Sequence, residues 1–238
     1  AIDLKQRKLV GAEAFARARH PELGILTPDA FLPGAGESAL IDLTRRVLGR
    51  ALHDWSSFAT IGVPIEPSIN VPLVALTKLS VFGILWEQKP DAPQWPGLTL
   101  EISEDEAIEN LTLVKKAVAE LRSYRISMAI DNFGPRYAEF CRWPDFPFTA
   151  IKIDRSFVKE VTRNSGSASI ISAVVSIAAD RNMITTAEGV ETDQHRATVH
   201  MLGCTNMQGS LFSRPVPAQD VRDLLAAAGF PQPSRETD

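Results

Sequence analysis

The sequence predicts a single α/β barrel in which strands, most of them parallel, alternate with helices. Short apolar runs alternate along the chain with longer segments whose apolar residues recur at helical spacing. Four acidic motifs, at residues 13–15, 100–104, 130–134 and 187–191, each follow one of these short runs. The length of 238 residues is more than a usual single domain needs and suits one barrel of this kind. Because the carboxyl ends of barrel strands meet at one rim, we expect the four motifs to converge there.

The expected strands are short and mostly apolar. The chain opens on residues 1–4 with the pattern of a strand already under way, and the run at 126–131 is apolar enough for burial on both faces of a sheet. Residues 90–97 hold three prolines and are expected to form a loop. Strands are expected over residues 1–4, 8–15, 65–70, 98–102, 126–131, 150–154, 184–188 and 206–208.

The helices between these strands are expected from their periodicity and from their first residues. Residues 37–58 carry apolar side chains at helical spacing. Pro72 is tolerated in the first turn of a helix, and Ser103 can cap a helix over 104–124. Further helices are expected over residues 166–182, 192–202 and 216–228, and an exposed loop over 20–24.

Composition and charge exclude several classes of function. A net charge of −4 provides no general basic face for nucleic acid. No apolar run reaches the roughly 18 residues that a membrane span needs, and no signal peptide opens the chain. Cys141 and Cys204 do not make a disulfide framework and are expected to be reduced thiols. We therefore expect a cytoplasmic barrel domain over residues 1–229 with a flexible tail over 230–238, cut from a longer multidomain protein that is itself free or membrane-attached.

Oxygen ligands at four strand ends predict a divalent-metal site. Three carboxylates and one amide oxygen are of the kind that Mg²⁺ and Mn²⁺ prefer; they belong to Glu13, Asn70, Glu101 and Asp131. Carboxylates that converge on one rim repel one another unless cations lie between them. The pattern therefore indicates metal ions and a phosphate-bearing ligand.

Four further positions suit the chemistry of such a ligand. Lys152 closes the strand after Asp131, where a cation can balance carboxylates or orient a water. Glu188 is a candidate second-metal ligand or general base. Arg17 suits a forked contact with a phosphate. Gln208 ends another strand, where an amide can read a base edge while Gly209 lets the ligand approach the backbone.

Seven motifs in order give the chain a resemblance to the EAL family of cyclic di-GMP phosphodiesterases, and the resemblance covers nearly the whole chain. The motifs lie at residues 11–17, 20–24, 100–104, 130–134, 151–158, 187–192 and 208–215. The resemblance implies a TIM-like (β/α)8 barrel, often dimeric, whose first strand is antiparallel. It also implies cyclic di-GMP as the ligand, which active members linearise to pGpG with two Mg²⁺ or Mn²⁺ ions.

The family's site residues transfer one by one to positions in this sequence. The resemblance places its first-metal ligands on Glu13, Asn70, Glu101 and Asp131. Lys152 matches the lysine near the attacking water, and Glu188 matches a ligand of the second metal that can also act as base. Glu104 matches the glutamate that steadies the loop after the third acidic motif, and Arg17 and Gln208 match ligand-binding positions.

The departures from the family cluster after Asp131. The second of two aspartates is replaced by Asn132, which keeps an oxygen but loses the charge that helps to hold the second metal. Such a loss is expected to cost at least about 10–100-fold in metal affinity. Pro135 and Arg136 replace a Thr-Gly pair and stiffen the loop. One hypothesis is that the Arg136 guanidinium reaches toward the second-metal position and neutralises Glu188 or a ligand phosphate.

Three smaller departures lie elsewhere. Pro72 replaces the serine of an Asn-Leu-Ser triplet. Phe15 replaces a leucine and is expected to remain an apolar packing residue, and Thr205 replaces an aspartate, which is expected to weaken recognition of guanine.

Three interpretations of function follow. The first is a degenerate, catalytically impaired receptor that binds cyclic di-GMP and signals to a protein partner or neighbouring domain. The second is a working metal-dependent phosphodiesterase. The third is a homodimerisation or docking module that no longer binds nucleotide. All three belong to bacterial second-messenger signalling of the kind that controls biofilm formation and motility.

Overall fold

The computed structural model describes residues 1–6, 8–59, 65–79, 81, 83–84, 95–140, 143 and 146–227. The predicted tail over residues 230–238, most of the predicted loop over 90–97, and Cys141 lie outside these residues. The predicted domain limits therefore stay a prediction. Among the described residues, no helix combines the length and the apolar character needed to cross a membrane.

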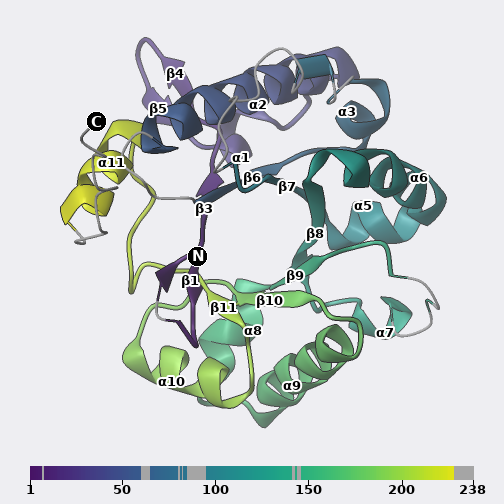
Figure 1. Ribbon diagram of the computed structural model, residues 1–238, viewed down its shortest axis with the longest axis vertical. Coiled ribbons are helices and arrows are strands. Elements are labelled where there is room, and N and C mark those ends of the chain that lie inside the picture. The colour runs from purple at the N-terminus through teal and green to yellow at the C-terminus, as the bar shows by residue number, and fades with distance from the viewer. Residues whose placement is uncertain are drawn as a thin grey trace, which may run out of the picture.

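The strands form a nearly closed barrel, which Figure 1 shows as a central ring. The described part of the main sheet consists, in spatial order, of β2 (Lys8–Leu9), β1 (Ile2–Asp3), β11 (Asn206–Met207), β10 (Ile184–Ala187), β9 (Ala150–Ile153), β8 (Ile126–Phe133), β7 (Leu98–Ser103), β6 (Glu66–Asn70) and β3 (Gly11–Ala14). Neighbours from β11 round to β3 pair in parallel, whereas β1 pairs antiparallel with β11 and with β2. This arrangement confirms the TIM-like barrel with an antiparallel first strand.

One stretch of chain brings the two edges of the sheet together. The edge strands β2 and β3 are separated in sequence only by Val10. The Val10 amide donates a hydrogen bond to the Ala1 carbonyl at 3.0 Å, and the Val10 carbonyl accepts one from the Glu66 amide at 3.2 Å. The single strand predicted over residues 8–15 therefore bonds to β1 at its start and to β6 along its remainder, which places Glu13 inside the ring.

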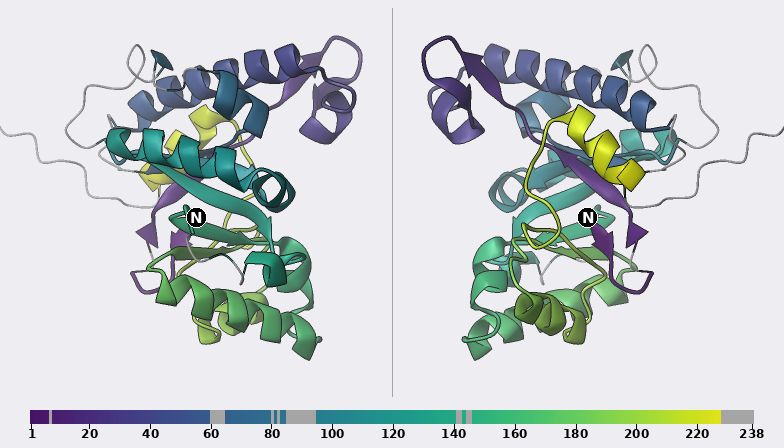
Figure 2. Two further views of the ribbon diagram at one scale, coloured as in Figure 1. Left: turned by 90° about the vertical axis from the view of Figure 1, so that its right-hand side faces the viewer. Right: turned by 90° about the vertical axis from the view of Figure 1, so that its left-hand side faces the viewer.

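The helices cover the outside of the barrel (Figures 1 and 2). They are α1 (Pro28–Phe31), α2 (Glu37–Ala59), α3 (Leu73–Lys78), α5 (Glu104–Glu109), α6 (Leu111–Leu121), the 3-10 turn η1 (Arg122–Tyr124), α7 (Tyr137–Phe140), α8 (Arg155–Glu160), α9 (Ser165–Asp180), α10 (Asp193–Met201) and α11 (Ala218–Ala227). A hairpin of β4 (Ala18–His20) and β5 (Gly24–Leu26) projects from the body together with α1 (Figure 2).

The burial of both faces of the central strands explains why their sequences are continuous apolar runs. Side chains on both faces of β7 and β8 are buried, because one face points into the barrel and the other meets the helices. Trp55 of α2 is 1% exposed, packs edge-on against Trp95 with ring centroids 4.7 Å apart, and donates its indole N–H to the Ile65 carbonyl. Val114 of α6 is fully buried in the same core. These contacts hold the ring rigid beneath the rim.

One local prediction was wrong, one is confirmed in more detail, and one helix was missed. The helix predicted over 104–124 breaks at Asn110, whose φ of −131° and ψ of 33° are not helical, so that α5 and α6 are separate. The loop predicted over 20–24 is the turn of the β4–β5 hairpin, in which the His20 Nδ1 accepts hydrogen bonds from the amides of Glu22 and Leu23. The short helix α8 was not expected; Asp154 caps it by accepting the Ser156 amide at 2.7 Å.

Candidate active site at the rim of the barrel

The strand register brings the predicted rim residues together. Asn70, the last residue of β6, lies beside Glu101 of β7, and Ser103 of β7 lies beside Asp131 of β8. Lys152 is the third residue of β9, and Glu188 follows the end of β10. Because all these strands are parallel, their carboxyl ends lie at the same edge of the barrel, as the motif positions predict.

A buried ammonium lies at the centre of four carboxylates. Lys152 Nζ lies 2.7 Å from Glu101 Oε2, 2.8 Å from Glu188 Oε1, 2.9 Å from Glu13 Oε2 and 3.3 Å from Asp131 Oδ1. The side chains of Lys152, Glu13 and Glu101 are 6%, 4% and 2% exposed. These groups come from strands β3, β7, β8 and β9 and from the residue after β10, so only the closed barrel brings them together.

Two amides complete the surroundings of Glu13. Asn70 Nδ2 donates to Glu13 Oε1 at 2.8 Å, and Gln208 Nε2 donates to Glu13 Oε2 at 2.7 Å. Gln208 follows β11, on the far side of the ring from β6. Glu13 is therefore held by amides from both sides and by Lys152, which fixes both of its oxygens.

The site carries more negative charge than its own cation can balance. Burial opposes the charge of Lys152, but the four carboxylates outweigh it and raise the pKa of Lys152 well above its ordinary value. Burial raises the pKa of Glu101 well above its usual range, raises that of Asp131, and raises that of Glu188 to about 7, although Lys152 pulls all three down. At Glu13 burial also raises the pKa, but the charge of Lys152 together with hydrogen bonds from Lys152 and Gln208 outweighs it, so the pKa is lowered. A further cation brought to this rim is therefore attracted to it.

Asp131 and Asn132 lie in an irregular part of β8. The register between β8 and β9 shifts between Ile130 and Phe133, so that β9 does not pair evenly with the residues between them. Asn132 has a φ of 54°, in the left-handed region that asparagine tolerates better than most residues, and it is exposed. Its Nδ2 donates to Asp131 Oδ2 at 3.0 Å. The amide of Asn132 thus satisfies one oxygen of Asp131.

The loop after β8 is held by Glu104, the first residue of α5. The buried Glu104 carboxylate accepts the Gly134 amide at 3.2 Å and the Arg136 amide at 3.1 Å. Gly134 has a φ of 141°, and a Cβ there would lie 2.6 Å from the Phe157 ring of α8. The loop is therefore packed between α5 and α8, and the role of Glu104 inferred from the resemblance has a physical basis in these contacts.

The Arg136 guanidinium pairs with the carboxylates of Asp105 and Glu139. It donates to both oxygens of Glu139, at 2.8 and 3.0 Å, and to Asp105 Oδ1 at 3.1 Å. The hypothesis that it reaches toward Glu188 is therefore not borne out by this arrangement. Neither Asp105 nor Glu139 was expected to have a role; the spacing of three residues between Arg136 and Glu139 was the available signal.

Two further residues predicted to bind the ligand, Arg17 and Gly209, lie outside the ring of carboxylates around Lys152. Arg17 is exposed, donates to the Ala16 carbonyl at 2.7 Å, and lies over the Phe15 ring at 5.5 Å from its centroid. The Phe15 side chain is 42% exposed, so the prediction that it is a packing residue was wrong. A Cβ on Gly209 would lie 2.1 Å from the Val190 carbonyl oxygen, so the packing of the chain itself requires glycine there.

Thr205 lies one layer below the rim. Its hydroxyl lies 3.3 Å from that of Thr185, and its amide donates to the Thr185 hydroxyl at 3.0 Å. Thr185 is the second residue of β10, three residues before Glu188. Thr205, where the resemblance implies an aspartate, thus contacts β10 through Thr185.

The chemistry of the rim fits a hard divalent cation such as Mg²⁺ or Mn²⁺. Its ligand atoms are carboxylate and amide oxygens. Asp131 Oδ1 is buried and has no hydrogen-bond partner among the described residues, and its cationic neighbour, the Lys152 ammonium at 3.3 Å, marks it as an oxygen that accepts a cation. As they stand, the described acidic, histidine and cysteine side chains include no group of three spaced to hold a metal; the four carboxylates surround the Lys152 ammonium instead. Glu13, Asn70, Glu101 and Asp131 are the residues that would hold the ion.

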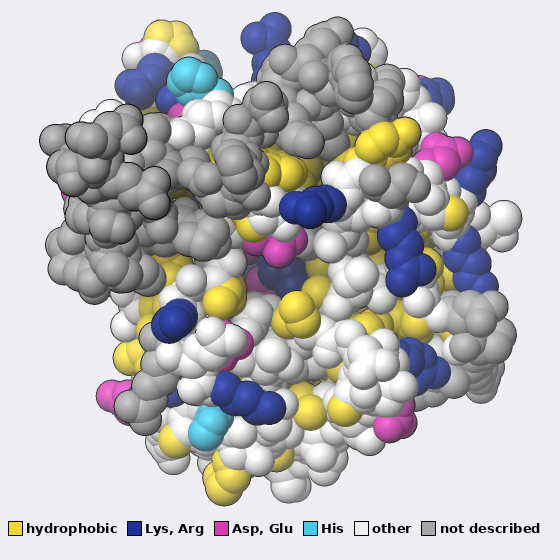
Figure 3. Space-filling view, viewed as in Figure 1, with side chains coloured by type: hydrophobic (Ala, Val, Ile, Leu, Met, Phe, Trp, Pro, Cys, Tyr) yellow, Lys and Arg dark blue, Asp and Glu magenta, His cyan; other side chains and the backbone are white. Residues whose placement is uncertain are grey.

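Seen along the barrel, the surface is hollowed at its centre, where acidic and basic side chains lie close together (Figure 3).

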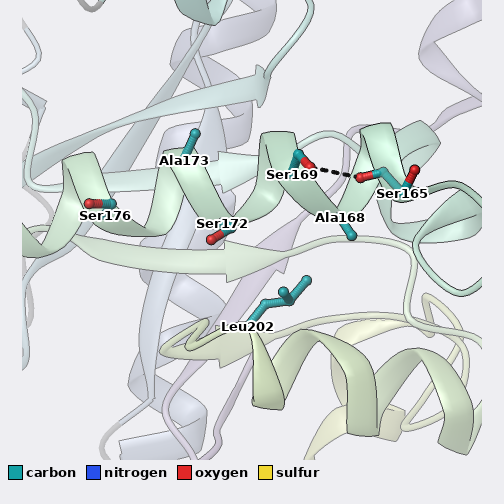
Figure 4. Close-up of a pocket in the computed structure, with 7 residues that line it drawn as sticks. All are labelled: Ser165, Ala168, Ser169, Ser172, Ala173, Ser176 and Leu202. Carbon is teal, nitrogen blue, oxygen red and sulfur yellow. Dashed lines mark hydrogen bonds between the residues drawn. The ribbon is translucent and has the colours of Figure 1, made fainter.

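A separate pocket lies outside the ring, along α9 and the end of α10 (Figure 4). It is lined by Ser165, Ser169, Ser172 and Ser176 on one face of α9 and by Leu202. The pocket contains none of the predicted site residues and is distinct from the acidic rim.

The barrel and its acidic rim define a class of α/β-barrel proteins with a metal-type carboxylate site. The family model of the EAL domain matches residues 1–215. The chain therefore belongs to the EAL domain family. One named relative is the cyclic di-GMP phosphodiesterase RocR of Pseudomonas aeruginosa, which is 33% identical over 222 residues, or 92% of this chain and 57% of that protein. A Mycobacterium tuberculosis protein is 30% identical over 237 residues, or 97% of this chain and 38% of that protein.

Solved structures show the same relationship. The PaMucR phosphodiesterase in complex with c-di-GMP matches with a TM-score of 0.81 and 28% identity, covering 92% of this chain and 90% of that chain. The EAL domain of Mycobacterium smegmatis DcpA matches with a TM-score of 0.70 and 31% identity, covering 81% of this chain and 88% of that chain. The chain thus corresponds to nearly the whole of these two domains but spans only 57% of RocR and 38% of the mycobacterial relative.

Proposed function

We propose that this chain binds cyclic di-GMP at the acidic rim and acts as a catalytically impaired receptor. The proposal is supported by the family, by the cyclic di-GMP complex of PaMucR and by the phosphodiesterase RocR. It is also supported by the surviving residues. Glu13, Asn70, Glu101 and Asp131 are all present around Lys152, and Gln208 is held at the same carboxylate.

The observation that carries the proposal is the state of Asn132. Where the resemblance implies a second aspartate, an exposed amide in left-handed conformation donates to Asp131 Oδ2. An amide brings no negative charge, and the hydrogen bond leaves that oxygen of Asp131 engaged. We infer that a first metal binds, whereas a second metal binds weakly.

Each residue of the rim would make a different contact with the ligand. A divalent ion at the first site would supply positive charge for a phosphate and would acidify a bound water. Lys152 supplies a second positive charge within the same ring, and Gln208 presents an amide at its edge. Arg17 is exposed beside Phe15, where its guanidinium is accessible to a phosphate.

A second candidate function, hydrolysis of cyclic di-GMP to pGpG, is favoured by Glu188. Burial raises the pKa of its carboxyl to about 7, against the pull of Lys152 2.8 Å away. A carboxylate with such a pKa can take a proton from water near neutral pH, as a general base must. With Glu188 in place, an active enzyme differs from the proposed receptor only in the occupancy of the second metal position.

The first experiment separates these two functions. The protein is incubated with cyclic di-GMP in excess Mn²⁺ and, in parallel, in EDTA, and both retained ligand and pGpG are measured. Ligand that is retained without cleavage supports the receptor, whereas Mn²⁺-dependent pGpG shows a working phosphodiesterase. Glu101→Gln is the control, because it removes a carboxylate from the first site; loss of binding in this variant places the ligand at the rim. Failure to retain or cleave the ligand under either condition refutes both functions.

We also propose that the domain works within a larger protein and as a homodimer. The coverage of RocR and of the mycobacterial relative supports the first statement, since both proteins are much longer than the matched region. Equilibrium sedimentation, with and without cyclic di-GMP, tests the second; a monomer under both conditions contradicts it.

A further inference from the structure

We propose that Arg136 is a positioning residue for the rim: its side chain clamps the segment after Asp131 and Asn132 onto α5 and α7, and so fixes those two residues for the metal and the ligand. The inference rests on the proposed function of the rim. It differs from the hypothesis of a direct contact with Glu188, because Arg136 acts here through the backbone.

The segment needs an anchor because strand pairing does not hold it fully. On one side, the pairing of β8 with β7 ends at Ser103 and Asp131. On the other side, the register with β9 shifts between Ile130 and Phe133, and pairing resumes only at Phe133, opposite Ile153. Asn132 thus lies beyond the last residue paired with β7 and inside the irregularity toward β9. Asn132 is paired with neither strand, so contacts made after Phe133 add to the pairing of Phe133 in fixing the position of Asn132.

Arg136 supplies such contacts through its backbone and its side chain. Its amide donates to Glu104, and its guanidinium donates to the neighbouring Asp105 at 3.1 Å. The same guanidinium makes a two-pronged contact with Glu139 of α7 at 2.8 and 3.0 Å. One residue therefore joins the first turn of α5, the loop after β8 and α7.

The clamp connects the two strand ends that carry first-site carboxylates. Ser103, the last residue of β7, accepts the Glu106 amide and caps α5, so α5 is fixed relative to Glu101 two residues earlier. The loop begins at Gly134, three residues after Asp131 and directly after the end of β8. When Arg136 ties the loop to α5, it also limits how far Asp131 and Asn132 can move from Glu101.

The geometry is of the kind that makes an ion pair effective near the surface. Single exposed pairs contribute little, whereas forked arginine–carboxylate contacts and networks of several charges are the exceptions. The Arg136 side chain is 32% exposed and pairs with two carboxylates. Pro135 adds to this effect, because its fixed φ restricts the residue before Arg136.

The test compares Arg136→Gln with Arg50→Gln. Arg50 also forms an ion pair, with Asp54 at 3.0 Å, but on α2 away from the rim. Two quantities are measured for each variant: hydrogen exchange in EDTA of the backbone amides at positions 134 and 136, and Mn²⁺ affinity by calorimetry. We expect Arg136→Gln to speed exchange of these amides and to weaken Mn²⁺ binding about 10-fold, the lower end for partners that orient ligands. Arg50→Gln is expected to change neither quantity.

A second variant separates geometry from charge. Arg136→Lys keeps the positive charge but cannot make the fork, so we expect it to resemble Arg136→Gln. Wild-type behaviour of Arg136→Lys would overturn the clamp in favour of a simple charge effect. The clamp is also overturned if Arg136→Gln lowers Mn²⁺ affinity without changing exchange of the two amides. It is overturned as well if Arg136→Gln speeds exchange without changing Mn²⁺ affinity.

The two proposals fail in different ways. Exchange in EDTA does not depend on any ligand, so unchanged exchange in Arg136→Gln refutes the clamp whatever the wild-type protein binds. Wild-type protein that binds neither Mn²⁺ nor cyclic di-GMP refutes the proposed function, and with it the role of the clamp at the rim. Glu139→Gln, which removes the fork from the other side, is expected to reproduce the effect of Arg136→Gln.

Discussion

The two sides of the rim are held in different ways. Around Glu13, Glu101 and Lys152, regular strands place buried side chains within hydrogen-bonding distance of one another. Around Asn132 and Arg136, an irregular strand end is held by loop contacts to α5, α7 and α8. The residues expected from the resemblance to depart from the family pattern, Asn132, Pro135 and Arg136, lie on this second side. A barrel keeps its regular strand ends in place through its core, whereas a loop can change in charge and in rigidity without disturbing that core.

The largest effect is expected on the regular side, from Lys152→Met. This variant leaves four carboxylates without their buried cation, and breaking a buried ion pair costs about 3–5 kcal/mol. Urea unfolding in EDTA measures the loss, and Mn²⁺ is expected to recover part of it. The control is Lys159→Met, because Lys159 pairs with Glu191 on the surface at 3.6 Å and its loss should cost at most about 1 kcal/mol. Equal losses in the two variants would contradict the importance of the buried cluster.

On the irregular side, Gly134→Ala tests the packing of the loop. The φ of 141° strains a residue with a side chain, and the added Cβ would collide with the Phe157 ring. We expect a loss of stability of about 1–3 kcal/mol, the usual cost of such a conformation. Thermal unfolding measures it. Gly36→Ala is the control, since a Cβ at Gly36 meets no atom within 4 Å. A loss no greater than that of the control would mean that the loop adjusts freely.

The pH dependence of the folding stability of the metal-free protein tests the contribution of Glu188 on the regular side of the rim. Its pKa in the folded protein is about 7, above the ordinary 4.5, so the folded state binds more protons between these values. The stability contributed by this group is therefore present at low pH and is lost as the pH rises from 4.5 through about 7. Glu188→Gln is expected to show a flatter dependence than wild type in this window. Urea unfolding at several pH values in EDTA measures it, with exposed Glu191→Gln as the control; identical slopes for wild type and Glu188→Gln would contradict the assignment.

The smallest change in stability, and the most informative change in function, is expected from Asn132→Asp. It replaces the donor to Asp131 with a like charge, so the metal-free protein should lose about 1 kcal/mol. A second metal position with its carboxylate restored should bind at least about 10-fold more tightly. Urea unfolding in EDTA measures the loss of stability, Mn²⁺ titration measures the metal affinity, and pGpG formation reports whether turnover follows. A variant with wild-type Mn²⁺ affinity and turnover would show that Asn132 is not what separates the receptor from the enzyme.

Much of the site could be predicted because its residues stand in short motifs at strand ends. The alternation of strands and helices is enough to place Glu13, Glu101, Asp131 and Glu188 at one edge. The helix breaks were harder to predict: the pattern over residues 104–124 is continuously helical, and the break at Asn110 depends on a local backbone turn. The β4–β5 hairpin was also hard to predict, because each of its strands has only three residues, which is too few to show an alternating pattern.

By itself, the sequence determined the barrel, its family and the acidic character of the rim, because strand periodicity and motif order are local properties of the chain. Only the tertiary structure decided which groups meet. Lys152 and Glu13 are 139 residues apart in sequence yet 2.9 Å apart in space, and Gln208 and Glu13 are 195 apart. The direction of Arg136 was decided in the same way, since Asp105 lies 31 residues before it on a different element. Contacts between distant segments arise from closure of the ring, which no local pattern records.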